Sequence, residues 1–270
     1  MTQRKFAPPK GVLRSAVADR QRYSHARYHA SPDLNQYVEH YWSVRWDLRG
    51  LKSERVETLP HPSVHMIFDQ HLGTRIGGVA RGKFSRILEG EGNVFAAKFR
   101  PGGFYPFVRV PVSSFTDAIV NLHDVFGGEG DVLGRTVLAE SDDPSRIMAV
   151  ESFLRRHRPK ADPNVIRIAD IVYAVAADRG IVKVEDLVDR YGIGKRTLQR
   201  LFAKYVGVSP KWVIQRYRLH EAAEQLAAGG LVSQSALALN LGYSDQAHFV
   251  RDFKRVVGVS PASYAKGAMV

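Results

Sequence analysis

The sequence predicts an α+β protein, in which an N-terminal antiparallel β domain is followed by an all-α domain with two helix-turn-helix units. Three observations support this fold class. A helix-turn-helix pattern occurs twice near the C-terminus, short segments rich in Val, Ile, Phe and Trp fill residues 40–99, and a polar segment with two prolines, 158–163, separates the two regions. At 270 residues the chain has room for two domains of ordinary size.

The C-terminal repeat contains an identical pentapeptide. Residues 206–210 and 257–261 both read Val-Gly-Val-Ser-Pro, at an offset of 51 positions (257 − 206), and Phe202 has Phe253 at the same offset. Further upstream the offset is 50, which indicates one extra residue in the turn of the second copy. A duplicated helical unit accounts for both the pattern and its spacing.

The first copy has the pattern of two amphipathic helices joined by a tight turn. Apolar residues of the first helix recur at helical spacing, at Val184, Leu187, Val188 and Tyr191. Gly192 and Gly194 then permit a sharp reversal. The second helix is expected to bury Leu198, Leu201, Phe202 and Tyr205, and to present Arg196, Gln199, Arg200, Ala203 and Lys204 on its other face. A helix that reads the major groove of DNA requires this division.

The second copy repeats this plan. Its first helix carries Leu237, Ala238 and Leu241, and its second helix is expected to bury Phe249 and Phe253 and to present Gln246, Ala247, Val250, Arg251 and Lys254. Ser244 is the expected N-cap, and Asp245 suits the positive end of the helix dipole. A helix that begins at Pro210 and stops before Gly229 is expected to join the copies. A plain bundle with solvated basic faces is the competing interpretation, which the repetition disfavours.

Residues 165–266 resemble the DNA-binding domain of the AraC/XylS family of bacterial transcription regulators. The segments that carry the resemblance are 242–249, continued by Arg251, Phe253 and Lys254, and 196–202; Gly194 departs from the Ser or Thr usual at its position. The resemblance implies that one chain inserts two helices into successive major-groove segments. The resemblance implies that the DNA-binding residues are Arg196, Gln199, Arg200, Gln246, Ala247, Val250 and Arg251. Lys204 is added to this set because it lies on the outward face of the first recognition helix.

The charge distribution agrees with double-stranded DNA as the partner. Residues 1–30 hold seven Lys/Arg against one acidic residue, residues 31–158 hold sixteen of each sign, and residues 159–270 hold sixteen Lys/Arg against ten acidic residues. The C-terminal region is therefore basic, as phosphate contacts demand. The basic arm 1–30 is expected either to fray or to follow the DNA backbone.

Composition excludes several classes of protein. Without cysteine there is no disulfide framework and no thiolate catalysis. No apolar run is long enough to cross a bilayer, and residues 1–22 lack the apolar core of a signal peptide. A soluble, cytoplasmic protein that makes no membrane contact is therefore expected.

The region 31–158 is expected to form a sensor domain, with a linker at 159–164. The expected strands are His40–Trp46, Glu54–Pro60, Ser63–Asp69, Thr74–Ala80, Gly82–Leu88 and Asn93–Phe99. Helical patterns follow at Asp117–Leu122, Val132–Ala139 and Ser145–Arg158. Residues 33–127 also resemble the sensor domain of one AraC-type subgroup, through 41–44, 59–60 and 99–103. The resemblance implies a cupin-like β fold that senses a small molecule or serves assembly.

Candidate effector contacts lie around the turn at 100–103. If the sheet encloses a cavity, Arg100 with Phe99, Phe104 and Tyr105 is expected to line it, with His65 as a further candidate, and a buried arginine would favour an acidic ligand. A purely structural bend is the competing interpretation, since Pro and Gly together make turns.

Metal-dependent and catalytic functions have little support. His61 and His65 would share one face of a strand, but no third ligand is marked, so no metal or cofactor is expected. No Gly-x-Ser-x-Gly motif or similar constellation occurs, so the protein is not expected to be an enzyme.

The sequence thus predicts a sequence-specific DNA-binding transcription regulator controlled by a small-molecule effector. RNA polymerase is a possible partner, and helix 145–158 could support a homodimer or pack on its own domain. The alternatives are a small-molecule-binding or metal-dependent β domain with incidental DNA association, and an architectural DNA-binding protein.

Overall fold

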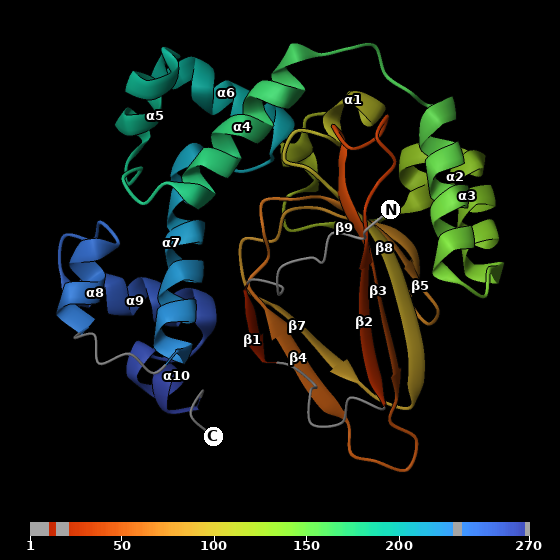
Figure 1. Ribbon diagram of the computed structural model, residues 1–270, viewed down its shortest axis with the longest axis horizontal. Coiled ribbons are helices and arrows are strands. Elements are labelled where there is room, and N and C mark those ends of the chain that lie inside the picture. The colour runs from red at the N-terminus through yellow and green to blue at the C-terminus, as the bar shows by residue number, and fades with distance from the viewer. Residues whose placement is uncertain (1–10, 15–21, 229–233, 268–270) are drawn as a thin grey trace.

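The chain folds into an N-terminal sandwich of two antiparallel sheets, which packs beside a helical C-terminal domain (Figure 1). The computed structural model describes residues 11–14, 22–228 and 234–267. One sheet has the strand order β2-β3-β8-β5-β6-β9 and the other the order β1-β4-β7. The strands are β1 (Val12–Arg14), β2 (Tyr23–Tyr28), β3 (Val38–Asp47), β4 (Glu54–Thr58), β5 (His65–Asp69), β6 (Gly73–Gly77), β7 (Phe84–Leu88), β8 (Glu91–Phe99) and β9 (Ile119–Asn121).

All six expected strands are present, as β3 to β8, but two expectations are wrong. Residues 23–28, expected in a basic arm, form β2, because their backbone pairs along its whole length with β3. The segment 117–122, expected to be helical, contains β9, which pairs with the edge of β6. The β-branched residues Ile119 and Val120 favour this extended backbone. The expectations for the rest of the arm, at 1–10 and 15–21, lie outside the described residues.

Strand alternation gives the six-stranded sheet two different faces. On β3, Tyr41 belongs to the core that continues into the helices, whereas Trp42, Val44 and Trp46 pack with Leu88 of the smaller sheet. Successive side chains of a strand point to opposite faces, but on β3 the register shifts between Val38 and His40, so Val38 lies in the same core as Tyr41. Polar side chains on the sandwich side are therefore enclosed between the two sheets.

Two helices, α2 (Leu122–Ala139) and α3 (Asp143–Arg156), cover the other face of the six-stranded sheet (Figure 1). The short helices α1 (Tyr105–Val108) and η1 (Val112–Phe115) precede them. Val150, Phe153 and Leu154 of α3 are buried, as its amphipathic pattern predicts. This helix therefore packs on its own domain.

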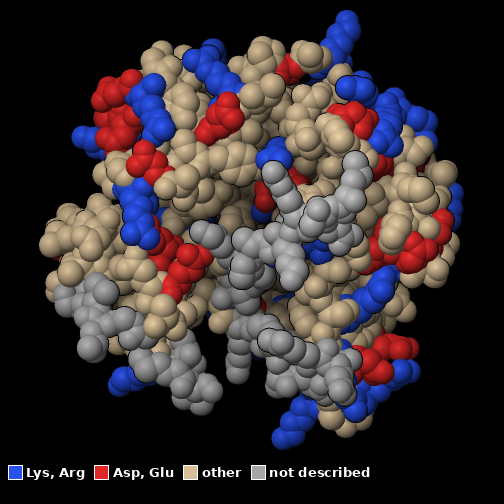
Figure 2. All heavy atoms as spheres, viewed as in Figure 1, with Lys and Arg blue, Asp and Glu red and all other residues tan. Residues whose placement is uncertain are grey.

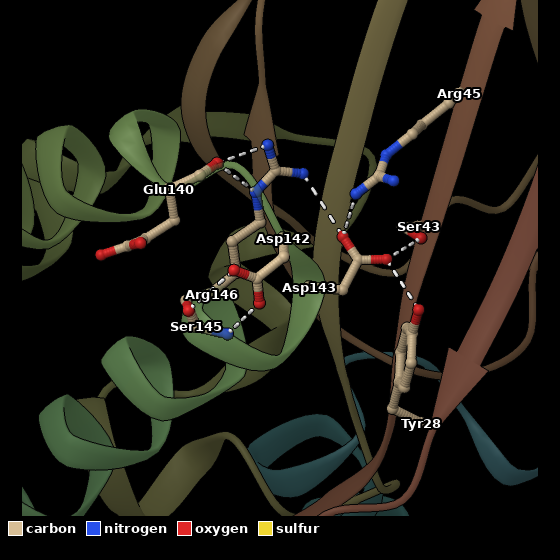
Figure 3. A network of polar contacts seen from close by, with 8 residues as sticks. All are labelled: Tyr28, Ser43, Arg45, Glu140, Asp142, Asp143, Ser145 and Arg146. Atoms are coloured by element: carbon tan, nitrogen blue, oxygen red, sulfur yellow. Dashed lines mark hydrogen bonds and ion pairs between the residues drawn. The ribbon is translucent and has the colours of Figure 1, made fainter.

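A polar network fixes the start of α3 on the sheet (Figure 3). The carboxylate of Asp143 is 4% exposed and accepts hydrogen bonds from Tyr28 (2.9 Å), Ser43 (2.7 Å) and Arg45 (2.7 Å). Arg146 lies 3.4 Å from the same carboxylate. One buried carboxylate therefore joins the start of α3 to two strands, because Tyr28 lies on β2 and Ser43 and Arg45 lie on β3.

The helical domain contains two helix-turn-helix units joined by the long helix α7 (Figure 1). Its helices are α4 (Pro163–Ala177), α5 (Val184–Tyr191), α6 (Lys195–Tyr205), α7 (Pro210–Ala227), α8 (Gln234–Asn240), α9 (Gln246–Val257) and α10 (Pro261–Gly267). No helix within the described residues is both long and apolar enough to span a membrane.

The two domains share hydrophobic cores. One continuous core contains Phe99 and Phe104 of the β domain together with Leu198 and Phe202 of the first helix-turn-helix unit. A second core holds Phe253 of the second unit and includes Leu59 of the β domain. At Gly207, whose φ is +95°, the backbone carbonyl accepts a 2.6 Å hydrogen bond from Thr116 of the β domain. The helical domain is therefore docked closely on the β domain.

Candidate nucleic-acid interface

The helix α6 separates buried apolar residues from exposed polar ones. Leu198 and Phe202 are fully buried, whereas Arg196, Gln199 and Arg200 are exposed. Gly194 is the N-cap and has no side-chain cap, which leaves the first backbone N–H groups of the helix available to an anion. This face of α6 can offer guanidinium and amide groups to DNA.

The helix α9 has the same division. Phe249 and Phe253 are fully buried, while Gln246, Ala247 and Arg251 are exposed. Val250 is half-buried and packs against the core of this unit, so only its edge faces outward. The exposed residues of α9 thus match those expected from the sequence.

The N-terminus of α9 differs in detail from the expectation. Its N-cap is Asp245, not Ser244, since the Asp245 carboxylate accepts a 2.7 Å hydrogen bond from the backbone N–H of His248. Accepting this bond lowers the pKa of Asp245. Gln246 is held by the hydroxyl of Ser235 at 2.9 Å, which positions its amide at the start of the helix.

Lys204 does not lie with the other residues of α6. It is half-buried, and its ammonium nitrogen lies 4.7 Å from the ring centroid of Tyr105 in the β domain. A cation over an aromatic face is attracted by the ring quadrupole. The structure therefore places Lys204 at the contact between the domains, and we do not propose it as a DNA contact in this arrangement.

Each helix exposes one further cation, Lys254 on α9, as the sequence predicted, and Lys195 on α6. Lys254 follows Ala247 at i+7 and Arg251 at i+3, which places the three on one stripe of α9. Lys195, the first residue of α6, is exposed and forms a 2.7 Å ion pair with Glu185. The exposed position of Lys254 could be predicted from its spacing in the sequence, whereas the ion pair of Lys195 with Glu185 could not.

Basic and acidic side chains are interspersed on the face drawn in Figure 2, including its upper left part, where α5 and α6 lie. Several of these charges are paired on the surface of the helical domain, such as Arg190 with Asp178 (2.6 Å). Exposed pairs of this kind contribute little to stability. Among the described residues, Arg196 and Arg200 of α6 and Arg251 of α9 are exposed and have no ion-pair partner.

The residues expected to contact an effector do not form one site. Phe99 and Phe104 are buried in the shared core, with ring centroids 5.1 Å apart, and a ligand could reach them only by unpacking it. The ring centroid of Tyr105 lies 4.6 Å from that of Tyr205 in α6, with the two rings tilted relative to each other. Arg100 donates to the backbone carbonyl of Asn35 and to the hydroxyl of Tyr173 in α4. These residues hold the domains together.

His65 is the one effector candidate that faces the space between the sheets. Its Nδ1 accepts a 3.2 Å hydrogen bond from the indole of Trp42. Burial, together with the positive charges of Lys98 and His40, lowers the pKa of His65 to about 3. The imidazole is therefore neutral at pH 7, with its proton on Nε2.

His61 and His65 do not form the strand pair that a metal site would need. β5 begins at His65, so His61 lies in the preceding loop, where its ring centroid is 4.5 Å from that of His220. In the part of the chain that the structure describes, there is no group of three His, Cys, Asp or Glu residues arranged to hold a metal ion.

Lowering the pH is expected to destabilise the fold through His65. Because the folded pKa of about 3 lies below the unfolded value of 6.5, the unfolded chain binds the proton first. The stability present above pH 6.5 is thus lost as the pH falls toward 3, by roughly 2 kcal/mol between pH 7 and 5 for this residue. Urea unfolding at both pH values should show a smaller loss for His65→Gln. The control is His71→Gln, at an exposed histidine, which should lose as much stability between pH 7 and pH 5 as the wild type does. Equal losses of stability in all three proteins would contradict the assignment of this effect to His65.

Comparison with known proteins agrees with this geometry. Residues 187–267 match a helix-turn-helix domain family, and residues 26–121 match a domain of unknown function (DUF6597). The chain is 32% identical over 83 residues to PqrA of Proteus vulgaris, described as a probable transcription factor, and covers 67% of it. It is 31% identical over 86 residues to the transcriptional regulator ExsA of Pseudomonas aeruginosa. The chain belongs to the AraC family of transcription regulators.

The sequence similarity to these relatives spans about a third of this chain. The match to ExsA covers 32% of this chain and only 30% of ExsA. The crystal structure of a probable AraC family regulator from Rhodopseudomonas palustris is 28% identical, with a TM-score of 0.33, over 36% of this chain and 93% of that one. ToxT from Vibrio cholerae is 13% identical, with a TM-score of 0.39, over 92% of this chain and 98% of that one.

Proposed function

We propose that this AraC-family protein is a sequence-specific DNA-binding transcription regulator that reads a duplex with α6 and α9. The observation that carries the proposal is the repetition, in one chain, of a helix with a buried apolar face and an exposed face of arginine and glutamine. Helix-turn-helix proteins use such a face in the major groove, and two of them on one chain would read two successive segments.

The residues have distinct roles in this proposal. Arg196 and Arg251 offer bidentate donors suited to guanine, and Gln199 and Gln246 offer the donor and acceptor pair that suits adenine. Arg200 and Lys254, with the uncapped N-terminus of α6, are suited to phosphate. Ala247 and the exposed edge of Val250 can contact a thymine methyl group.

Arg251→Ala is expected to relax sequence preference more than it lowers general affinity for DNA. Loss of one bidentate base contact costs about 1–3 kcal/mol on the preferred site, which is roughly a 5- to 150-fold loss there. On unrelated DNA the loss should be small, since phosphate contacts dominate nonspecific binding. Selection of binding sites from a random duplex library, followed by anisotropy titrations at fixed salt, measures both quantities.

The matched control is Arg135→Ala, since Arg135 is exposed on α2, in the β domain. It should change neither affinity nor preference. Equal losses on all sequences for Arg251→Ala would assign Arg251 to the DNA backbone, and full affinity for the preferred site would contradict a role for α9.

Control by a small molecule is part of the proposal, because the helical domain is docked on a β domain with polar side chains enclosed between its sheets. Binding of RNA polymerase, dimerisation and action in the cytoplasm are expectations of this function. The rival, a β-domain binding protein with incidental DNA association, predicts no selected sequence in the library experiment.

A further inference from the structure

The loop between α4 and α5 lies where the two helix-turn-helix units meet. We call it the inter-unit loop, and it consists of residues 178–183. Ile181 of this loop is buried in the core that holds the first unit, and Val182 lies against Gly242, in the turn between α8 and α9. A Cβ atom on Gly242 would come within 2.8 Å of the Cβ atom of Val182. The inter-unit loop therefore forms a direct contact with the second unit.

Arg218 holds the inter-unit loop on α7, the helix that joins the units. Its side chain is buried, and its Nη2 donates to the backbone carbonyls of Asp178 at 2.8 Å and Ile181 at 2.9 Å. Its Nη1 donates at 3.0 Å to Glu221 of α7, which also pairs with Arg179 at 2.7 Å. A guanidinium presents its donors in a fixed planar fork, so the two bonds to the loop fix its position on α7.

The inter-unit loop is also tied to the first unit. The carboxylate of Asp178 accepts from the backbone N–H of Gly180 at 2.8 Å and from Arg190 of α5 at 2.6 Å. The backbone N–H of Val182 donates at 2.8 Å to Asp186, in the first turn of α5. The loop and α5 are thus joined by several bonds, so a displacement of the loop should carry the first unit with it.

The other end of α7 carries the second unit. Leu219, Ala222 and Ala223 of α7 lie in the same core as Phe249 and Phe253 of α9. Arg218 directly precedes Leu219 in the chain. The side chain that fastens the first unit to α7 is therefore adjacent to the residues on which the second unit packs.

Arg218 has no means of contacting DNA itself. It is 4% exposed, and both of its Nη atoms donate to protein acceptors. A buried carbonyl or guanidinium that loses its partner costs free energy, so the loop should stay where these bonds place it. Any influence of Arg218 on DNA recognition must act through the placement of the two units.

We propose that Arg218 is a positioning residue that fixes α9 relative to α6 through the inter-unit loop. Its bonds hold the loop on α7, the loop is tied to the first unit, and Val182 meets the turn that precedes α9. The consequence for DNA, a single accepted separation of the two recognised segments, rests on the proposed function. The placement of the two helices does not.

The geometry of DNA explains that consequence. One added base pair moves a segment by about 3.4 Å along the duplex and turns it by about 34–36°. Hydrogen bonds to base edges form only within about 2.7–3.2 Å, so a helix held in place cannot follow such a shift. Two units in a fixed arrangement accept one separation, whereas two loosely joined units accept several.

The first test measures the placement of the two helices without DNA. The chain has no cysteine, so spin labels can be placed at Ala203→Cys on α6 and Ala247→Cys on α9, both at exposed alanines. Double electron-electron resonance then gives the distribution of distances between the labels. We expect one narrow distribution in the otherwise unchanged protein. With Arg218→Met, the distribution should be at least about twice as wide, because several arrangements become populated.

Two further variants separate positioning from general stability. Val182→Ala removes the methyl groups that face Gly242 and should also widen the distribution; because Val182 is 39% exposed, this variant should fold even if Arg218→Met does not. The matched control is Arg216→Met. Arg216 is a buried arginine of the same helix, but its acceptors are the carbonyls of Arg81 and Gly82 in the β domain, so the distribution should keep its width.

The second test measures the accepted separation on DNA. Duplexes carrying the sequence selected by the protein are compared with duplexes in which the two segments are one base pair closer or farther apart. The wild type should lose at least about tenfold in affinity on the altered duplexes, since contacts to one segment are lost. For Arg218→Met the three affinities should lie within about threefold of one another.

The proposal is overturned if Arg218→Met and Val182→Ala both keep the original distance distribution, or if Arg216→Met widens it as much as Arg218→Met does. A wider distribution with an unchanged preference for one separation would overturn the consequence for DNA. Failure to select any DNA sequence would remove the proposed function alone, because the distance measurement still decides the role of Arg218.

Discussion

Phe253→Ala is expected to lower the free energy of unfolding by about 3–5 kcal/mol, the range for deleting a buried aromatic ring. Phe253 is fully buried between Phe249, with ring centroids 5.7 Å apart, and Tyr264, at 5.6 Å. This small core positions α9, so the loss should fall on the second helix-turn-helix unit. Urea unfolding measures the change, and DNA affinity should fall as well.

The control for this prediction is Leu239→Ala, because Leu239 of α8 is 66% exposed. An exposed apolar residue contributes within about 0.5 kcal/mol, so this variant should unfold like the wild type. Native-like unfolding of Phe253→Ala would contradict the burial of this ring and, with it, the placement of α9.

Asp143→Ala is expected to cost a similar amount, about 3–5 kcal/mol, by a different mechanism. The substitution leaves the guanidinium of Arg146 buried without its carboxylate and removes the acceptor for Tyr28, Ser43 and Arg45 (Figure 3). The packing of α3 against the six-stranded sheet should be lost first. Hydrogen exchange of α3 and β2 locates the loss, and urea unfolding measures it.

Asp143→Asn keeps the shape of the side chain and one acceptor oxygen, so it should be less destabilising than the alanine variant. The exposed carboxylate of Asp47, paired with Arg49 at 2.7 Å, provides the matched control, and Asp47→Ala should leave stability nearly unchanged. Equal stability of Asp143→Ala and Asp47→Ala would show that the network contributes nothing.

The helical domain was predictable because its signals are local. Helical periodicity located α5, α6 and α9, and the exposed positions of Arg196, Gln199 and Arg251 followed from the same stripe that buries Leu198 and Phe253. The six strands β3 to β8 were predictable for the same reason, because each is a short segment rich in β-forming residues between turn residues. β2 was not, because only its pairing with β3 makes it a strand.

The contacts between the two domains were much less predictable. The sequence grouped Arg100 with Phe99 and Phe104, which are neighbours along the chain, but the structure puts the two phenylalanines in the core and joins Arg100 to Tyr173. The groups that do converge, such as Lys98 and His220, are 122 positions apart (220 − 98). No pattern of spacing brings such residues together.

By itself, the sequence determined the two recognition helices and the family, since the repeat and its amphipathic stripes are properties of short segments. Only the tertiary structure decided that Lys204 turns toward Tyr105, that the cores of both units extend into the β domain, and that His61 meets His220. The physical reason is the separation along the chain of the residues that interact. Periodic burial acts within a few residues of the chain, whereas docking of two domains depends on surfaces assembled from distant segments.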